Sequence, residues 1–280
     1  MIVLLGGSGF IGRHVEAALR ELTPQDVVVL PRGEDPRPLT PKVVINCAGA
    51  TRGRPGELVA ANVVLVSRLL AMIEPGTRLL HVGSATEYGR VPMGPPVTEE
   101  TTCLPVTPYA LTKLTATELI RASEAEATVL RPFNVVGPGA TMVGKLVRDL
   151  RAGGDLVVGG LELYRDFVDV RDVARAVALA ALSDESLPPV LNLGGGEATA
   201  VRDLVSTLVE LAGPGRRVTP GETAPEAVPW LCADATAAGQ ALGWRPEISL
   251  RQALQHAWEF TGEAAGQQDA PREPEEAGDE

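Results

Sequence analysis

The chain has few aromatic residues and fewer basic than acidic ones. Aromatic residues make up 4% of its 280 positions and apolar residues 45%, so a core must consist mainly of Leu, Val and Ala. Lys and Arg number 25 against 36 Asp and Glu, and the net charge of −11 argues against nucleic acid as a partner. The length allows one large domain or two modest ones with a real core.

Cysteine and long apolar runs are also scarce. Cys47, Cys103 and Cys232 are scattered and odd in number, which indicates neither a disulfide framework nor a metal site. No apolar run reaches the length of a membrane span, and the chain opens on a strand pattern without a charged leader. We therefore expect a cytoplasmic protein with no bound metal and no membrane partner. Residues 263–280 carry seven acidic residues and one Arg without apolar periodicity, which predicts a disordered acidic tail.

The first residues predict a strand, a glycine turn and the start of a helix. Residues 2–5 are all apolar, as a strand covered on both faces requires. Gly6, Gly9 and Gly12 follow at a spacing that permits a tight turn and lets backbone N–H groups approach a pyrophosphate. The phosphate would then lie at a helix N-terminus, where unpaired N–H groups favour negative charge. This stretch predicts a dinucleotide site, with a plain strand–helix turn as the alternative.

Strand and helix patterns alternate from there to position 132, which predicts an α/β fold with a doubly wound parallel sheet. The predicted strands are 26–30, 42–49 (running into a loop at its end), 77–82 and 127–131, and the predicted helices are 13–22, 57–72 and 109–123. The Pro-rich linker 33–41 is too short for a full helix and predicts a loop or turn.

Beyond position 132 the pattern is less regular. Helices are expected at 141–152, 170–182, 200–211 and 250–260, and strands at 155–160 and 189–193. We interpret residues 1–135 with about 166–195 as a Rossmann domain, and about 136–165 with 196–262 as a smaller mixed α/β substrate-binding region.

Tyr109 and Lys113 are spaced to share one face of a helix. An ammonium near a phenol lowers the phenol pKa from about 10, which would make Tyr109 a proton donor or acceptor for a carbonyl/alcohol pair. Ser84 follows the end of the predicted strand 77–82, where ligands bind in open α/β sheets, and its hydroxyl can bond the same substrate oxygen. A surface Tyr and Lys, and a Ser in a turn, are the alternatives.

Several motifs occur in order along the chain. They are Gly6–Gly12, Asn46–Gly49, Asn62, Ser84–Gly89, Tyr109–Lys113, Leu130–Pro138, Arg165–Asp172 and Leu242–Pro246. Together they resemble the extended short-chain dehydrogenase/reductases, the NAD(P)-dependent nucleotide-sugar epimerase, dehydratase and reductase family. The resemblance spans residues 1 to about 262 and implies a nucleotide-diphospho-sugar substrate and a homodimer built on a four-helix bundle.

The resemblance also implies roles for single residues. Ser84, Tyr109 and Lys113 would form the catalytic triad, with Lys113 also holding the nicotinamide ribose. The cofactor-binding residues would be Gly6, Gly9, Phe10, Ile11, Gly12, Arg13, Arg32, Ala48, Gly49 and Asn62, together with Tyr109 and Lys113. The substrate would contact Thr86, Asn134 and Arg165. Asn134 as a turn residue, and Arg165 in an ion pair with Asp169 or Asp172, are the alternatives.

The residues at two positions narrow the range of reactions that we expect among those of this family. The family's 4,6-dehydratases need acids directly after the active-site Ser or Thr, where this chain has Ala85 and Thr86. Reductases that also epimerise C3 and C5 use a Cys/His pair, and Ala85 stands where the Cys would be. Both activities are therefore disfavoured. Glu87, at a position that is apolar in the family pattern, is interpreted as structural.

The cofactor is expected to be NADP rather than NAD. The second strand ends at Arg32 with no acid to bind a ribose 2′-hydroxyl, and an Arg there can pair with a 2′-phosphate, helped by Arg13. The linker 33–41 lacks the usual adenine-binding strand, and Asp35 is the candidate replacement.

We therefore expect NADPH-dependent reduction of the C4 ketone of a nucleotide-diphospho-deoxysugar, with Tyr109 as the proton donor. An NAD-dependent C4 epimerase of UDP- or dTDP-sugars is the alternative among enzymes. A non-catalytic NADP-sensing regulator is the alternative of another class.

Overall fold

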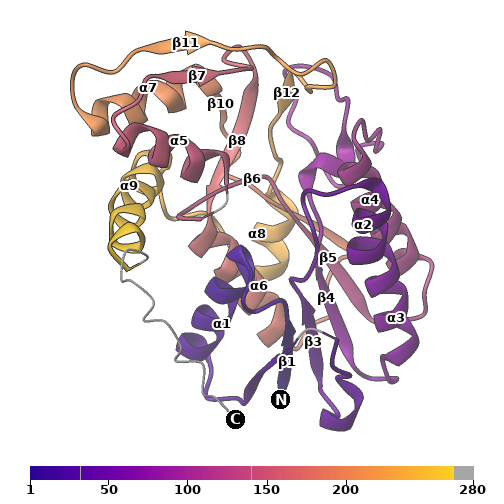
Figure 1. Ribbon diagram of the computed structural model, residues 1–280. Helices are drawn as coiled ribbons and strands as arrows, with labels where there is room; N and C mark the ends of the chain where they lie inside the picture. The colour runs from indigo at the N-terminus through magenta and orange to yellow at the C-terminus, as the bar shows by residue number, and fades with distance from the viewer. Residues whose placement is uncertain (32, 140, 268–280) are drawn as a thin grey trace, which may run out of the picture.

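The computed structural model describes residues 1–31, 33–139 and 141–267 (Figure 1). Its main sheet has six strands in the order β2-β1-β3-β4-β5-β9, and every neighbouring pair is parallel. The strands are β1 (Ile2–Leu5), β2 (Val27–Leu30), β3 (Val43–Asn46), β4 (Arg78–Val82), β5 (Ala127–Pro132) and β9 (Val190–Leu193). The predicted Rossmann-like α/β fold is confirmed.

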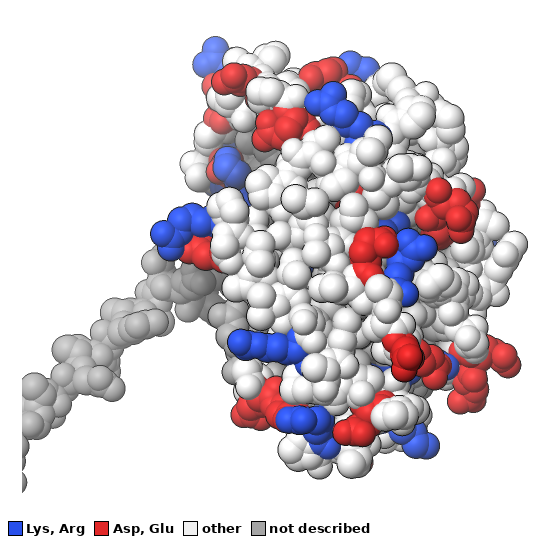
Figure 2. All heavy atoms as spheres, turned by 90° about the vertical axis from the view of Figure 1, so that its right-hand side faces the viewer, with Lys and Arg blue, Asp and Glu red and all other residues white. Residues whose placement is uncertain are grey.

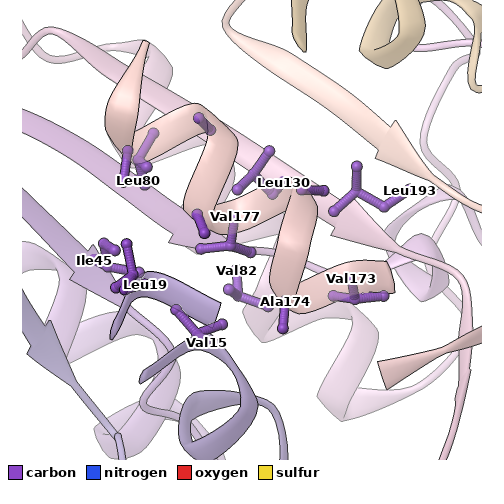
Figure 3. Close-up of a cluster of buried hydrophobic side chains, with 14 of the residues drawn as sticks. Val15, Leu19, Ile45, Leu80, Val82, Leu130, Val173, Ala174, Val177 and Leu193 are labelled. Atoms are coloured by element: carbon purple, nitrogen blue, oxygen red, sulfur yellow. The ribbon is translucent and has the colours of Figure 1, made fainter. Parts of the chain in front are cut away.

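Helices cover both faces of this sheet, which explains why its strands are nearly all apolar. One face carries α1 (Phe10–Leu22) and α6 (Val170–Leu182), and the other carries α3 (Leu65–Met72) and α4 (Pro108–Arg121). Figure 3 shows the first of these layers, in which side chains of the sheet meet those of α1 and α6. The labelled side chains are Val15, Leu19, Ile45, Leu80, Val82, Leu130, Val173, Ala174, Val177 and Leu193.

The predicted helix 57–72 is continuous but not regular. It begins as α2 (Pro55–Leu58), passes through the π-helical segment η2 (Val59–Val64) and continues as α3. Contrary to our expectation, the stretch Pro55–Met72 is long and apolar enough to cross a membrane by length and composition, with 22% of it buried. Part of its apolar surface has a partner within the fold, because Val66 and Leu69 pack in the core beneath α4.

The linker 33–41 forms only one 3-10 turn, η1 (Arg37–Leu39), so the prediction of a loop or turn is correct. β2 is consequently an edge strand of the main sheet.

A smaller region follows β5 and lies above α1 and α6 in Figure 1. Its strands are β6 (Asn134–Val136), β7 (Leu156–Val158), β8 (Tyr164–Asp169), β10 (Ala198–Ala200), β11 (Val218–Pro220) and β12 (Trp230–Leu231). β8 pairs with β6 and β12 in parallel and with β10 in antiparallel fashion, so this sheet, unlike the main one, is mixed in strand direction. Helices α5 (Met142–Arg151), α7 (Val201–Ala212) and α9 (Leu250–Gln267) enclose a separate apolar core.

Two details differ from the expected layout. Helix α8 (Thr236–Leu242) and the buried Trp244 pack into the core beside α6, although their segment was assigned to the substrate region. Helix α9 continues to Gln267, past the point where a disordered tail was predicted to begin. The rest of that predicted tail, 268–280, lies outside the described residues. The proposed domain limits stay a prediction.

Candidate active site

Ser84 and Tyr109 meet at the carboxyl end of β4. Ser84 follows the last strand residue, Val82, by two positions and caps η3 (Ala85–Tyr88), with its hydroxyl 2.8 Å from the Thr86 hydroxyl and accepting from the Thr86 N–H at 3.2 Å. Tyr109 lies in the first turn of α4, which begins after Thr107 caps the Ala110 N–H at 3.1 Å. The Ser84 side chain is close enough to the Tyr109 phenol to act on its pKa.

The pKa of Tyr109 is shifted in the opposite direction to our expectation. Burial raises it above its ordinary value of 10.0, and the nearby Ser84 side chain only partly opposes this. Lys113 does not lower it, because its Nζ donates to the Val82 carbonyl at 2.6 Å and lies 3.2 Å from His81 Nε2. Tyr109 is therefore protonated at neutral pH, as a proton donor must be.

Lys113 is enclosed by the ends of β3 and β4. Burial lowers its pKa to about 8, and Glu87 and Cys47 oppose that shift. Behind it His81 contacts Asn46, whose Oδ1 accepts from the Ala48 N–H at 3.0 Å. Neither a role for His81 nor a polar role for the Asn46 side chain was predicted from the sequence.

Glu87 is fully buried directly beneath Ser84. Its Oε1 accepts from the Ser84 N–H at 2.8 Å, and its Oε2 accepts from Thr117 Oγ1 at 2.7 Å and Arg131 Nε at 2.9 Å. The structural interpretation of Glu87 therefore agrees with its contacts. Because one carboxylate binds β5, α4 and the Ser84 backbone, it holds the serine in position.

The glycine turn after β1 forms a tight cradle. Gly6 has φ +75°, and a Cβ there would lie 2.5 Å from the Ala48 nitrogen. A Cβ on Gly12 would lie 2.0 Å from the Gly6 carbonyl oxygen. Gly9 caps α1 without a side-chain hydrogen bond, and the first turn contains no acid, so its N–H groups are available to an anion. The cradle therefore fits the pyrophosphate of a dinucleotide.

Three more of the predicted cofactor residues lie at the start of α1. Phe10, Ile11 and Arg13 lie in the first turns of α1, where the Arg13 guanidinium donates to the Pro138 carbonyl at 2.6 Å and lies 5.6 Å from the centre of the Phe10 ring. Arg13 thus joins α1 to the loop after β6. Arg32 lies outside the described residues.

Asn62 acts within the protein. Its amide bonds both backbone groups of Ala50 at 2.9 Å and donates to Thr112 Oγ1 at 3.0 Å. Asn62 thereby ties the loop of Ala48 and Gly49 to α4, and this position lies in the π-helical segment. On the adenine side Asp35 pairs with Arg37 at 2.6 Å on the surface.

The predicted substrate residues lie at the start of the smaller region and on η3. Thr86 is exposed beside Ser84. Asn134 begins β6 and donates to the Asp166 carbonyl at 3.2 Å, so it is a strand residue rather than a turn residue. Arg165 lies on β8, close to Asn134 because that residue is in register with Phe167.

Arg165 does not form the ion pair that we considered. Asp169 pairs with Arg171 at 2.8 Å, and Asp172 pairs with Arg175 at 3.3 Å. Burial lowers the pKa of Arg165, and within the described residues it forms no salt bridge. A partly buried guanidinium without a carboxylate partner is suited to bind an anionic group such as a phosphate.

Metal-ligand clusters of three or more His, Cys, Asp or Glu do not occur among the described residues.

Asp166, which sequence reasoning missed, accepts backbone N–H groups of Gly195, Gly196 and Ala233 at 2.6–3.0 Å. It joins β8 to the loop after β9 and to the chain after β12. Burial raises the pKa of Asp166 to about 6.

Known proteins share this architecture. The model of the NAD dependent epimerase/dehydratase family matches residues 2–194. A dTDP-6-deoxy-L-talose 4-dehydrogenase (NAD(P)(+)) from Kitasatospora kifunensis is 38% identical, over 92% of this chain and 94% of its own length. A UDP-glucose 4-epimerase from Corynebacterium glutamicum is 30% identical, over 76% and 72%. RMD from Pseudomonas aeruginosa, solved with NADPH, superposes with a TM-score of 0.81 at 25% identity, over 94% of this chain and 99% of that one.

The family model covers more than half of the chain, and the glycine cradle, the Ser84–Tyr109 contact and the buried Lys113 lie within the matched residues. The chain therefore belongs to the NAD-dependent epimerase/dehydratase family, as an enzyme that acts on nucleotide sugars.

Proposed function

We propose that the protein reduces the C4 ketone of a nucleotide-diphospho-deoxysugar with NADPH. The observation that carries this proposal is the position of Tyr109 beside Ser84 at the carboxyl edge of the main sheet, the edge that also holds the glycine cradle, where burial raises the pKa of the phenol. A tyrosine that keeps its proton is suited to give it to an alkoxide formed by reduction. The relative from Kitasatospora kifunensis supports position 4 of a dTDP-sugar, because its name specifies a 4-dehydrogenase of that class.

The side chains divide the work of the reaction. When bound, the nicotinamide supplies a hydride to C4. Ser84 donates a hydrogen bond to the C4 oxygen, and Tyr109 gives that oxygen its proton as negative charge develops. The first-turn N–H groups of α1 bind the cofactor pyrophosphate, and Arg165 binds a phosphate of the sugar nucleotide. Glu87 and Lys113 are fixed before the substrate arrives, so little reorganisation remains for the reaction itself.

NADPH is proposed over NADH because Arg32 follows β2 without an acid that would accept from a ribose 2′-hydroxyl. The similarity to RMD, solved with NADPH, supports this choice. The proposed preference is tested by the ratio of kcat/KM for NADPH and NADH with the same 4-keto sugar. We expect a ratio above about ten, since a charge-assisted pair with the 2′-phosphate is worth about 1.5–3 kcal/mol. A ratio of one or less contradicts the preference.

A C4 epimerase with bound NAD is the second candidate, favoured by the similarity to the Corynebacterium glutamicum epimerase. An epimerase recycles its cofactor, so the purified protein would carry nicotinamide at a stoichiometric level and interconvert C4 epimers without consuming NADPH. A non-catalytic NADP sensor is the third, but it would have no need of Tyr109 beside Ser84 or of a buried Lys113.

The assembly proposed with this function is a cytoplasmic homodimer built on the face of η2 and α4. Val59, Val64, Leu111 and Leu119 of these helices are 37–56% exposed. Figure 2 shows this side of the molecule, and its middle carries few charged side chains. Apolar residues exposed on two adjacent helices favour a partner surface of the same kind, as in a second copy of the chain.

A further inference from the structure

A buried line of hydrogen bonds runs behind Lys113. Lys113 Nζ lies 3.2 Å from His81 Nε2, and His81 Nδ1 lies 3.0 Å from Asn46 Nδ2. Asn46 and His81 are neighbours in the register of β3 and β4, so their side chains lie on the same face of the sheet. Both are at most 1% exposed, which leaves water out of the line.

The direction of each hydrogen bond follows from its fixed end. The Ala48 N–H can only donate, so it determines which end of the Asn46 amide is the oxygen. Asn46 Nδ2 then faces His81 and donates to Nδ1. A neutral imidazole that accepts at Nδ1 carries its hydrogen at Nε2. The Nε2–H of His81 therefore points at Lys113 Nζ.

We propose that His81 is a positioning residue: held by Asn46, it presents its Nε2–H to Lys113 and so favours the neutral amine over the ammonium. An ammonium has no lone pair and cannot accept a hydrogen bond from that N–H, whereas a neutral amine accepts it through its lone pair. The amine still donates to the Val82 carbonyl at 2.6 Å. This inference rests on the proposed function in treating Lys113 as part of the reaction site.

The charges around Lys113 agree with this assignment. The titratable groups that face it are His81, Cys47 and Glu87, and Glu87 is already paired with Arg131. Burial and then Lys113 hold the pKa of His81 well below 6.5, so His81 is neutral at physiological pH. Burial raises the pKa of the Cys47 thiol to about 12 and keeps it uncharged.

The consequence is a lysine that changes its protonation close to physiological pH. Burial brings the pKa of Lys113 to about 8 although Glu87 and Cys47 oppose the shift, and a His81 N–H that faces Nζ disfavours the ammonium in the same direction as burial. Such a lysine releases its proton as the pH rises through about 8 and regains it as the pH falls. A permanently charged ammonium would only supply a fixed field.

The composition makes a direct test practicable, because the chain has three histidines and three lysines. The full-length protein, labelled with ¹⁵N in His and ¹³C in Lys, is titrated by NMR without substrate or cofactor. We expect His81 to stay the Nε2–H tautomer from about pH 6 to about pH 9. We expect Lys113 to titrate near 8.

Two substitutions alter the line in different ways. His81→Phe removes the donor and should raise the Lys113 midpoint by about one pH unit. Asn46→Asp accepts from both the Ala48 N–H and His81 Nδ1–H, which turns His81 Nε2 into an acceptor and should raise the midpoint by about one unit or more. His256→Phe, which alters a histidine on α9, is the matched control and should leave the midpoint unchanged.

An Nδ1–H tautomer or a protonated His81 in the wild-type protein would overturn the inference, as would an unchanged or lowered Lys113 midpoint in the variants. If His81→Phe does not fold, the wild-type tautomer and Asn46→Asp decide the matter. The NMR readout needs no turnover, so it separates this inference from the proposed function. The expected tautomer without reduction of any 4-keto sugar would refute the function alone, and reduction with the other tautomer would refute the inference alone.

Discussion

Glu87 shows how one residue couples stability to the site. Its carboxylate binds the Ser84 backbone, Thr117 and Arg131, and none of these groups can turn to solvent because all lie in the interior. Removing one partner of a buried ion pair leaves the other charge uncompensated, which is far more costly than removing an exposed pair.

We therefore predict that Glu87→Gln lowers the free energy of unfolding by about 3–5 kcal/mol. Glu118→Gln is the control, because Glu118 pairs with Arg121 at the surface and the change should cost about 0.5 kcal/mol or less. Urea unfolding of both variants measures the difference. Similar small losses in the two variants would mean that Arg131 finds another partner.

Acidification tests the protonation state of His81. The pKa of His81 in the folded protein lies well below 6.5, so below pH 6.5 the unfolded chain binds a proton that the folded chain does not. The free energy of unfolding therefore decreases as the pH decreases. Between pH 7 and about 5.5 the wild-type protein should lose about 1 kcal/mol of unfolding free energy through His81, and the His81→Phe variant should not show this loss. Comparing the two proteins by urea unfolding cancels Asp166, whose raised pKa of about 6 acts in the opposite direction. Equal losses would contradict the buried, neutral His81.

At the residue scale the candidate catalytic residues could be named from the sequence, whereas their surroundings could not. Ser84, Tyr109 and Lys113 stand in local motifs, so their identity was available without a structure. The pKa of Tyr109 was not, because it depends on burial and on where Lys113 turns. His81 comes from a strand whose pairing with β3 only the fold reveals.

At the scale of elements, we propose that the first turn of α1 determines where the cofactor binds. The helix starts without a side-chain cap, and Gly12 packs so closely on Gly6 that no Cβ fits between them. The turn can therefore form this tightly only because Gly6 and Gly12 carry no Cβ.

Gly12→Ala should weaken NADPH binding by at least about tenfold, because the new Cβ would lie 2.0 Å from the Gly6 oxygen and must displace the cradle. Gly56→Ala is the matched control, since its Cβ meets nothing within 4 Å and Ala favours a helix. Calorimetric titration with NADPH compares the two. Binding that survives Gly12→Ala unchanged would place the pyrophosphate elsewhere.

Element type and order were largely predictable from apolar periodicity as far as β5, and the linker 33–41 was correctly expected to lack a full helix. Beyond β5 the short elements β6, β8, β10, β11, β12 and α8 were not predicted. The π-helical segment Val59–Val64 was not predictable, because its apolar pattern fits an ordinary helix. Its effect is local: it lies where Asn62 bonds Ala50 and Thr112. The extension of α9 to Gln267 was missed because that stretch has no apolar period.

At the scale of the molecule, the apolar face of η2 and α4 is the feature that the fold itself does not use. We predict that the protein sediments as a dimer at micromolar concentration and that Leu111→Glu converts it to a monomer, because a charge would be buried on both sides of the contact. Val157→Glu is the control, a still more exposed apolar position on β7 in the smaller region, at 72% against 56% for Leu111. A dimer that tolerates Leu111→Glu, or a wild-type monomer, would contradict this interface.

We propose above that Tyr109 protonates the C4 oxygen of a nucleotide sugar during reduction by NADPH. The direct measurement incubates purified protein with a dTDP-4-keto-6-deoxysugar and follows NADPH absorbance and the sugar product together. We predict one NADPH consumed for each 4-hydroxy product, with the rate falling about 100-fold or more in Tyr109→Phe. Interconversion of C4 epimers without NADPH consumption, or a Tyr109→Phe variant as fast as the wild type, would contradict the account.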